Sequence, residues 1–263
     1  MSRAPGWQDH AWTQVDGRVL HAAGAGSAAL PTVVLVHGQG VSHRYLGPLA
    51  SRLSASARVV ALDLPGFGRS RCTEADLDLR ALSTALVGWL RATGREGAVV
   101  VGHSTGCQVV VDAAVHSPQA LGRVVLAGAT VDARARSWPK QALRLLADLP
   151  LQRPDLLPVI AGDYLRCGTR RYIRTFEHML ADRIEDKVAA LTSPTVLVRG
   201  QLDAVSPRAW NRMLLDRLPD GRLVEVAGGG HNIGWTRSAG FAQVLQEVVA
   251  ATVADGHAVL SSG

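Results

Sequence analysis

The fold is decided by one stretch of the sequence, Val99-Val100-Val101-Gly102-His103-Ser104-Thr105-Gly106-Cys107-Gln108-Val109-Val110-Val111. A β-branched run leads into Gly-His-Ser-Thr-Gly and an apolar run leaves it, which predicts a buried strand followed by a buried helix. The pattern G-x-S-x-G between them is typical of a nucleophile elbow, a sharp strand-to-helix turn. Gly102 and Gly106 supply the small neighbours that such a turn needs. The turn exposes the Ser104 hydroxyl, and the helix N-terminus behind it favours developing negative charge.

Apolar runs recur on both sides of this stretch and alternate with helical patterns. Such alternation predicts an α/β fold with a mostly parallel, twisted sheet and helices on both faces. A hairpin precedes it, because Asp16-Gly17 separates two strand-like segments. The tail from Gly256 to Gly263 is expected to fray. Besides the strand before Ser104 and a helix after it to about 116, the expected strands are 11–15, 18–22, 32–36, 58–62, 123–127, 195–199 and 222–226, and the expected helices are about 44–55, 77–93, 207–218 and 238–253.

The alternation breaks between about 130 and 193, where no strand-like run occurs. This segment instead holds helical stretches rich in Arg and Leu and interrupted by prolines. We therefore expect a core domain whose first part is 1–129 and whose second part is 194–263, with a helical insertion at 130–193.

The ends of the expected strands carry the residue types that acyl transfer needs. Reactive residues in open parallel sheets lie at the carboxyl ends of the strands. A serine hydroxyl is a poor nucleophile near neutral pH, so it needs a base that takes its proton and an acid that orients the base. The chain has nine histidines as candidate bases.

The motifs at these strand ends resemble those of the α/β-hydrolase superfamily, and the resemblance covers nearly the whole chain. It is carried by five blocks in family order, each just past an expected strand: His37-Gly38-Gln39-Gly40, Asp63-Leu64-Pro65-Gly66-Phe67-Gly68-Arg69-Ser70, Gly102-His103-Ser104-Thr105-Gly106, Gly200-Gln201-Leu202-Asp203 and Gly229-Gly230-His231.

The resemblance implies a catalytic triad in the order Ser, Asp, His. Ser104 would be the nucleophile, His231 the base and Asp203 the acid. Asp132, just beyond the expected strand 123–127, is the alternative acid, because some members of the superfamily place theirs there. Asp63 is expected to hydrogen-bond nearby backbone as part of the scaffold.

The oxyanion hole is expected to consist of two backbone N–H groups, those of Gln39 and Thr105. His103 lies next to the serine but on the strand, so its side chain points to the opposite side and is expected to be a buried hydrogen-bonding group. His37 is expected to brace the loop that carries Gln39.

The insertion at 130–193 resembles the helical cap of such enzymes, which selects substrates and excludes water. Trp138, Tyr164 and Phe176 are candidate substrate-binding residues in it, although aromatic residues at helical spacing also form ordinary cores. Trp235, four residues after His231, is a further candidate.

The expected function is a serine hydrolase that cleaves an ester, thioester or related acyl bond of a small apolar substrate through an acyl-enzyme. The same residues suit a carbon–carbon bond hydrolase. The fold also hosts lyases, cyclases, cofactor-free oxygenases and binding proteins. Haloalkane dehalogenases and epoxide hydrolases place Asp at the nucleophile, so Ser104 argues against them.

Composition excludes several other classes. The net charge is +6, but only Lys140 and Lys187 of the 28 basic residues are lysines, and the arginines are spread along the chain. No nucleic-acid reader motif or membrane-length apolar run occurs, so neither nucleic acid nor a membrane is an expected partner. No metal-ligand spacing or cofactor motif occurs either, so no metal or cofactor is expected. The three cysteines, Cys72, Cys107 and Cys167, lack disulfide-framework spacing, and no signal peptide is recognised. These features predict a cytoplasmic protein. The sequence does not specify its oligomeric state.

Overall fold

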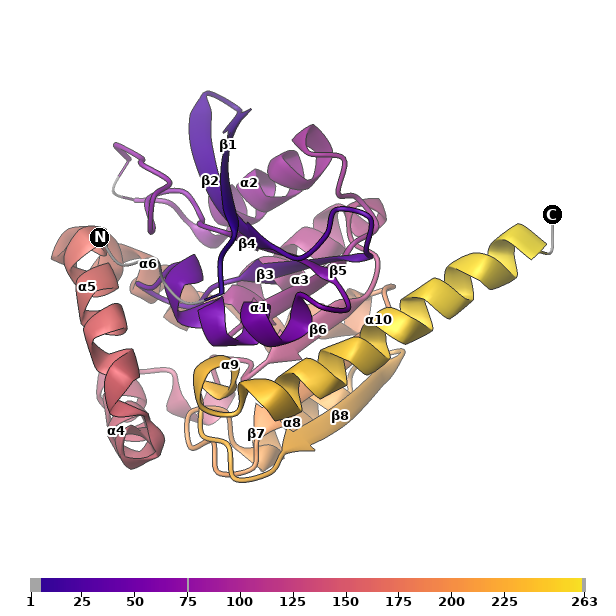
Figure 1. The fold of residues 1–263 in the computed structure, drawn as a ribbon. Coiled ribbons are helices and arrows are strands. Elements are labelled where there is room, and N and C mark those ends of the chain that lie inside the picture. The colour runs from indigo at the N-terminus through magenta and orange to yellow at the C-terminus, as the bar shows by residue number, and fades with distance from the viewer. Residues whose placement is uncertain (1–5, 75, 262–263) are drawn as a thin grey trace.

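The computed structural model describes residues 6–74 and 76–261. Eight strands form one sheet in the order β1-β2-β4-β3-β5-β6-β7-β8 (Figure 1). The first two pairings, β1 with β2 and β2 with β4, are antiparallel, and the remaining pairings are parallel. The strands are β1 Asp9–Val15, β2 Arg18–Ala25, β3 Thr32–Val36, β4 Arg58–Leu62, β5 Val99–His103, β6 Val124–Ala127, β7 Thr195–Gly200 and β8 Gly221–Val226.

Helices cover both faces of the sheet. They are α1 Gly47–Leu53, α2 Leu79–Ala92, α3 Gly106–His116, α4 Trp138–Asp148, α5 Leu157–Cys167, α6 Thr169–Ala181, α7 Ile184–Lys187, α8 Arg208–Leu215, α9 Ile233–Thr236 and α10 Ser238–Ser261. Within the described residues, no helix has both the length and the apolar character needed to cross a membrane. The α/β fold expected from the sequence is confirmed.

Two apolar cores explain why the strand before the elbow carries three consecutive valines, Val99, Val100 and Val101. Val100 belongs to a core that includes residues of α2 and α3. Val99 and Val101 belong to a second core with residues of α1 and α10. Successive side chains of a strand point to opposite faces, so a central strand that is covered on both faces is apolar throughout.

The hairpin and the sheet edge follow local chemistry. Asp16 and Gly17 both have positive φ, +45° and +76°, as the tight hairpin turn predicted from Asp-Gly requires. The second strand continues three residues beyond the predicted end, to Ala25, because Ala22–Ala25 pair with β4.

Two helical expectations need correction. The helix expected at 44–55 is divided into a short 3-10 helix, His43–Leu46, and α1, because Pro48 lies in the first turn of α1, where its missing N–H is tolerated. The tail expected to fray over 256–263 is instead helical to Ser261, where α10 ends, and residues 262–263 lie outside the described structure. The far end of this helix projects from the body in Figure 1. No proline interrupts this stretch.

Helices α4, α5 and α6 lie between β6 and β7 in the chain. Figure 1 shows α4 and α5 together along one side of the molecule. These helices fall within the segment 130–193 that the sequence predicts to be a cap.

Candidate active site

Ser104 lies on a sharp turn between β5 and α3. Its φ is +56°, in the left-handed region that non-glycine residues rarely adopt. A Cβ atom at Gly102 would lie 2.7 Å from the carbonyl oxygen of Gly106, and one at Gly106 would lie 2.6 Å from that of His37. The strand, the helix and the neighbouring loop therefore meet so closely that both positions require glycine, as the G-x-S-x-G spacing predicts.

Ser104, His231 and Asp203 are joined by hydrogen bonds. Ser104 Oγ lies 2.9 Å from His231 Nε2, and His231 Nδ1 lies 3.0 Å from Asp203 Oδ2. The other carboxylate oxygen of Asp203 accepts backbone N–H bonds from Val205 and Ser206, at 2.8 and 2.9 Å. The loop after β7 thus fixes the carboxylate in a buried position, and the loop after β8 brings the imidazole between it and the serine.

The charges of this group set the pKa values of its members. Burial alone lowers the pKa of His231, but the charge and hydrogen bond of Asp203, together with the charge of Asp148, outweigh it and raise the pKa above the ordinary value. Burial raises the pKa of Asp203, yet His231 and the backbone N–H bond from Ser206 bring the net pKa below the ordinary value. The arrangement therefore favours an ionised carboxylate beside a basic imidazole.

Asp132, the alternative acid, lies elsewhere. Its Oδ2 is 2.6 Å from Arg144 Nη2, and its Oδ1 accepts the backbone N–H of Arg134 at 3.0 Å. Within the described part of the chain, no hydrogen bond or ion pair joins Asp132 to His231. The structure thus brings Asp203, and not Asp132, to the imidazole.

The loop that carries Gln39 runs beside the serine. A Cβ atom at Gly38 would lie 3.1 Å from Ser104 Cβ and 3.6 Å from Ser104 Oγ. The backbone N–H groups of Gln39 and Thr105 donate no hydrogen bond to any other described residue. The Gln39 side chain reaches α6, where its Nε2 donates to the carbonyl oxygen of Tyr172 at 2.9 Å.

His103 connects this loop to the loop of His231. The Gly38 N–H donates to Tyr45 Oη at 3.1 Å, and this hydroxyl lies 2.8 Å from His103 Nδ1. On the other side of the ring, His103 Nε2 lies 2.9 Å from the carbonyl oxygen of His231. Burial, reinforced by the charge of His231, lowers the pKa of His103 to about 3, so the ring is neutral at physiological pH. Tyr45 was not foreseen from the sequence.

His37 supports the loop that carries Gln39. Its Nε2 accepts the Leu64 N–H at 3.0 Å, which leaves its Nδ1 to donate to the Gly38 carbonyl oxygen at 2.8 Å.

Three of the four candidate substrate-binding residues lie together. The ring centroids of Trp138 and Phe176 are 4.3 Å apart, and Tyr172 lies between Phe176 and Tyr164 at 6.1 and 5.2 Å. A Cβ atom at Gly40 would lie within 2.8 Å of the Tyr164 and Tyr172 rings, so this aromatic group packs against the loop of Gln39.

Trp235, the fourth candidate, lies apart from this aromatic group. It is buried on α9, and its Nε1 donates to Asp155 Oδ1 at 2.9 Å.

Asp148 is a site residue that the sequence did not indicate. It ends α4 and is 2% exposed, and its Oδ1 accepts the backbone N–H of His231 at 2.8 Å. Burial raises the pKa of this carboxyl group. A single aspartate in an Arg- and Leu-rich helical pattern predicts only a solvent-facing position, so no sequence signal marks this contact.

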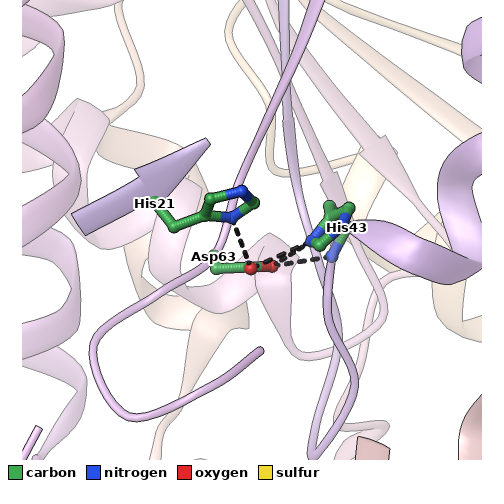
Figure 2. A group of neighbouring side chains, drawn as sticks. All are labelled: His21, His43 and Asp63. Carbon is green, nitrogen blue, oxygen red and sulfur yellow. Dashed lines mark hydrogen bonds and ion pairs between the residues drawn. The ribbon is translucent and has the colours of Figure 1, made fainter. Parts of the chain in front are cut away.

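A separate buried group, His21, His43 and Asp63, has the donor types of a metal site. Within the described residues, its potential ligand atoms lie within 4.8 Å of one another, and Figure 2 shows both imidazoles turned toward the carboxylate. Asp63 Oδ1 already accepts the His43 N–H at 2.8 Å, while Oδ2 accepts the Arg69 N–H at 2.9 Å and lies 2.8 Å from His21 Nδ1. Because the carboxylate is saturated by protein donors, we place no metal there.

An eight-stranded sheet with a serine at the turn after β5 and a histidine after β8 defines an α/β-hydrolase. A model of the alpha/beta hydrolase family matches residues 33–244. The chain therefore belongs to that family, and it is a hydrolase enzyme.

Individual similar proteins are distant in sequence. The chain is 27% identical over 229 residues to a pimeloyl-[acyl-carrier protein] methyl ester esterase of Xylella fastidiosa, covering 76% of this chain and 88% of that protein. It is 27% identical over 263 residues to a 2-hydroxy-6-oxononadienedioate/2-hydroxy-6-oxononatrienedioate hydrolase of Pseudomonas putida, covering 86% and 90%. The structure of a thermophilic esterase from Thermogutta terrifontis is similar in fold, with a TM-score of 0.78, 19% identity and coverage of 93% and 99%.

Proposed function

We propose that this hydrolase cleaves an ester, thioester or related acyl bond of a small apolar substrate through an acyl-enzyme on Ser104. The observation that carries the proposal is the hydrogen-bonded series Ser104 Oγ, His231 Nε2, His231 Nδ1 and Asp203 Oδ2, with separations of 2.9 and 3.0 Å. The name of the Xylella relative, an ester hydrolase, supports the same class of substrate.

In the first half-reaction, Ser104 Oγ attacks the substrate carbonyl carbon while His231 Nε2 takes the hydroxyl proton. The carbonyl oxygen becomes an oxyanion, which the free N–H groups of Gln39 and Thr105 stabilise. His231 then gives its proton to the leaving alcohol or thiol, the bond to the leaving group breaks, and the acyl group remains on Ser104. Asp203 holds the imidazole in the required tautomer and stabilises its charged form.

In the second half-reaction, His231 takes a proton from water, whose oxygen attacks the acyl carbon. The tetrahedral intermediate collapses, the bond to Ser104 Oγ breaks, and His231 returns the proton to the serine. The products are the free acid and the regenerated enzyme.

The segment 130–193 is proposed to be the cap over this site. Trp138 and Tyr164 are each 40% exposed, and they belong to the aromatic group beside the loop of Gln39. Exposed aromatic faces next to the oxyanion loop favour an apolar acyl or alkoxy group. Trp235 remains a proposed substrate contact on the side of His231.

The test is labelling with a fluorophosphonate probe, followed by mass spectrometry of the labelled peptide. We expect the label on Ser104, and we expect Ser104→Ala and His231→Ala to abolish it. His116→Ala, which removes an exposed imidazole at the end of α3, is the matched control and keeps the wild-type labelling rate. Absence of label on the folded wild-type protein contradicts the proposal.

A substrate panel then separates ester from carbon–carbon bond cleavage, the alternative that the name of the Pseudomonas relative supports. Turnover of short-chain and aromatic p-nitrophenyl esters is expected. Labelling of Ser104 with cleavage of a vinylogous β-diketone but no ester turnover overturns the acyl-substrate proposal.

A further inference from the structure

The last residue of α4, Asp148, binds the loop that carries His231. Asp148 Oδ1 accepts the His231 backbone N–H at 2.8 Å. A Cβ atom at Gly230 would lie 2.7 Å from this same oxygen and 2.9 Å from Leu151 Cβ. The aspartate therefore packs directly against the backbone that leads into the imidazole.

Two further contacts join the segment after α4 to the residues that follow His231. Asn232 Nδ2 donates to Gln152 Oε1 at 2.9 Å, and the other end of that amide, Nε2, donates to Asp148 Oδ2. Trp235 Nε1 donates to Asp155 Oδ1 at 2.9 Å. The residues 148–155 thus bind 231–235 at three successive points.

The sequence before His231 explains why such support matters. Residues 228–230 are three consecutive glycines, which restrict the backbone less than any other residue type. The peptide groups around His231 are fixed by two side chains: Asp148 accepts the N–H, and His103 donates to the carbonyl oxygen at 2.9 Å. Both are buried, so water does not replace them.

We propose that Asp148 is a positioning residue for the catalytic base, which fixes the backbone of His231 and places a second negative charge beside its imidazole. The inference rests on the proposed role of His231 as the base. It links the end of α4 to the proton transfer itself, beyond any role of that helix in substrate selection.

Three side chains contact the imidazole of His231: Asp203 and Ser104 by hydrogen bonds, and His103 by ring packing with centroids 5.0 Å apart. His103 is neutral at physiological pH, and Asp148 acts on the imidazole through its charge, because its hydrogen bond is to the His231 backbone N–H. Removal of the Asp148 charge leaves Asp203 as the acidic group on the ring, so the pKa of His231 falls. Since the base must be unprotonated to act, the acid limb of the kcat/KM profile then moves to lower pH.

The experiment compares Asp148→Asn and Asp148→Ala with wild type, using ester turnover across pH and the fluorophosphonate labelling rate. Both variants lack the charge, so both are expected to shift the acid limb to lower pH. Asp148→Asn keeps an oxygen for the His231 N–H, whereas Asp148→Ala removes it and is expected to lower plateau kcat about 10- to 100-fold with a smaller change in KM.

Asp186→Asn is the matched control. It removes an exposed carboxylate charge from the same segment, 130–193, where Asp186 pairs with Arg183 and Arg217 rather than with the loop of His231. Its acid limb and plateau are expected to match wild type. Thermal melts establish that each variant is folded, and if Asp148→Ala is not, the nearly isosteric Asp148→Asn carries the test.

Two failures are distinguishable. A labelled, active wild type whose acid limb is unchanged in the folded Asp148 variants shows that Asp148 only stabilises the fold, and it overturns this inference alone. Absence of Ser104 labelling in wild type instead overturns the proposed function on which the inference rests.

Discussion

Ser104 illustrates how much of a single residue's chemistry is fixed by its neighbours. Its φ of +56° is unfavourable for a serine, and it persists because β5 and α3 hold the residue from both sides. The same constraint directs its hydroxyl toward His231 rather than into the strand. The conformation is thus a consequence of the two glycines that allow the strand and the helix to meet.

The choice between two carboxylates gives a prediction at this scale. Asp203→Asn is expected to lower kcat about 10⁴-fold, because an amide neither holds the required imidazole tautomer nor stabilises the imidazolium. Asp132→Asn is the matched control, since Asp132 pairs with Arg144 rather than with His231. Steady-state turnover of a p-nitrophenyl ester by the two variants shows which aspartate is the acid. A nearly active Asp203→Asn beside an inactive Asp132→Asn transfers the role to Asp132.

Residues whose function is signalled by local spacing could be predicted, and those that depend on distant contacts could not. The elbow serine and the glycines beside it are recognisable within five positions of sequence. The partner of the His231 N–H is Asp148, 83 positions away, and nothing near Asp148 in the sequence marks it. Asp63 was expected to bind backbone, as it does, but the imidazoles of His21 and His43 come from elements 42 and 20 positions away.

At the scale of elements, Asp63 joins β2, β4 and the 3-10 helix His43–Leu46 through one buried carboxylate (Figure 2). Burial alone raises the pKa of this carboxyl group, but hydrogen bonds from His21 and His43 outweigh it and hold the pKa far below the ordinary value. A depressed folded-state pKa contributes stability at pH values above the unfolded pKa of 3.8, and this stability is lost as the pH falls below it.

Asp63→Asn is therefore expected to lower the free energy of unfolding by about 3–5 kcal/mol at neutral pH, because it removes one partner of a buried charged group. The difference from wild type shrinks as the pH falls below 3.8. Urea denaturation at neutral and acidic pH measures both effects. Asp76→Asn, which changes an exposed carboxylate beside His178, is the control and leaves stability nearly unchanged. An equal loss in both variants contradicts the account.

The aromatic group of α4, α5 and α6 gives a second prediction at this scale. Trp138→Ala removes a ring 4.3 Å from Phe176, and it is expected to reduce kcat/KM for an aromatic acyl ester about 5-fold relative to an acetyl ester. Leu165→Ala, which removes an apolar side chain that is 85% exposed on α5, is the control and keeps the wild-type ratio. An unchanged ratio in Trp138→Ala places the substrate elsewhere.

The same contrast between local and distant determinants holds for elements. The Asp16-Gly17 turn was predictable because its geometry is set by the two residues themselves. The division of the helix at 44–55 depends on Pro48, a local signal that the apolar pattern obscured. The extension of β2 to Ala25 depends on pairing with β4, which no local pattern contains.

At the scale of the whole molecule, the segment 130–193 is not packed as a separate body. Cys167, Met179 and Ile184 belong to the same apolar core as α2, α3 and one face of the sheet. The carbonyl oxygen of Met179 also accepts a hydrogen bond from Gln108 Nε2 of α3 at 2.8 Å. We therefore propose that the segment unfolds together with the core, although its sequence interrupts the strand pattern.

Met179→Ala tests this proposal. The side chain is 2% exposed, so its truncation is expected to lower the free energy of unfolding by about 2–5 kcal/mol. If the segment and the core form one cooperative unit, far-ultraviolet circular dichroism and loss of fluorophosphonate labelling at Ser104 shift to lower urea together. Leu165→Ala, on the exposed side of the same segment, shifts neither. Labelling that disappears at a lower urea concentration than the helical signal contradicts the proposal, because the site is then lost while most of the helical structure remains.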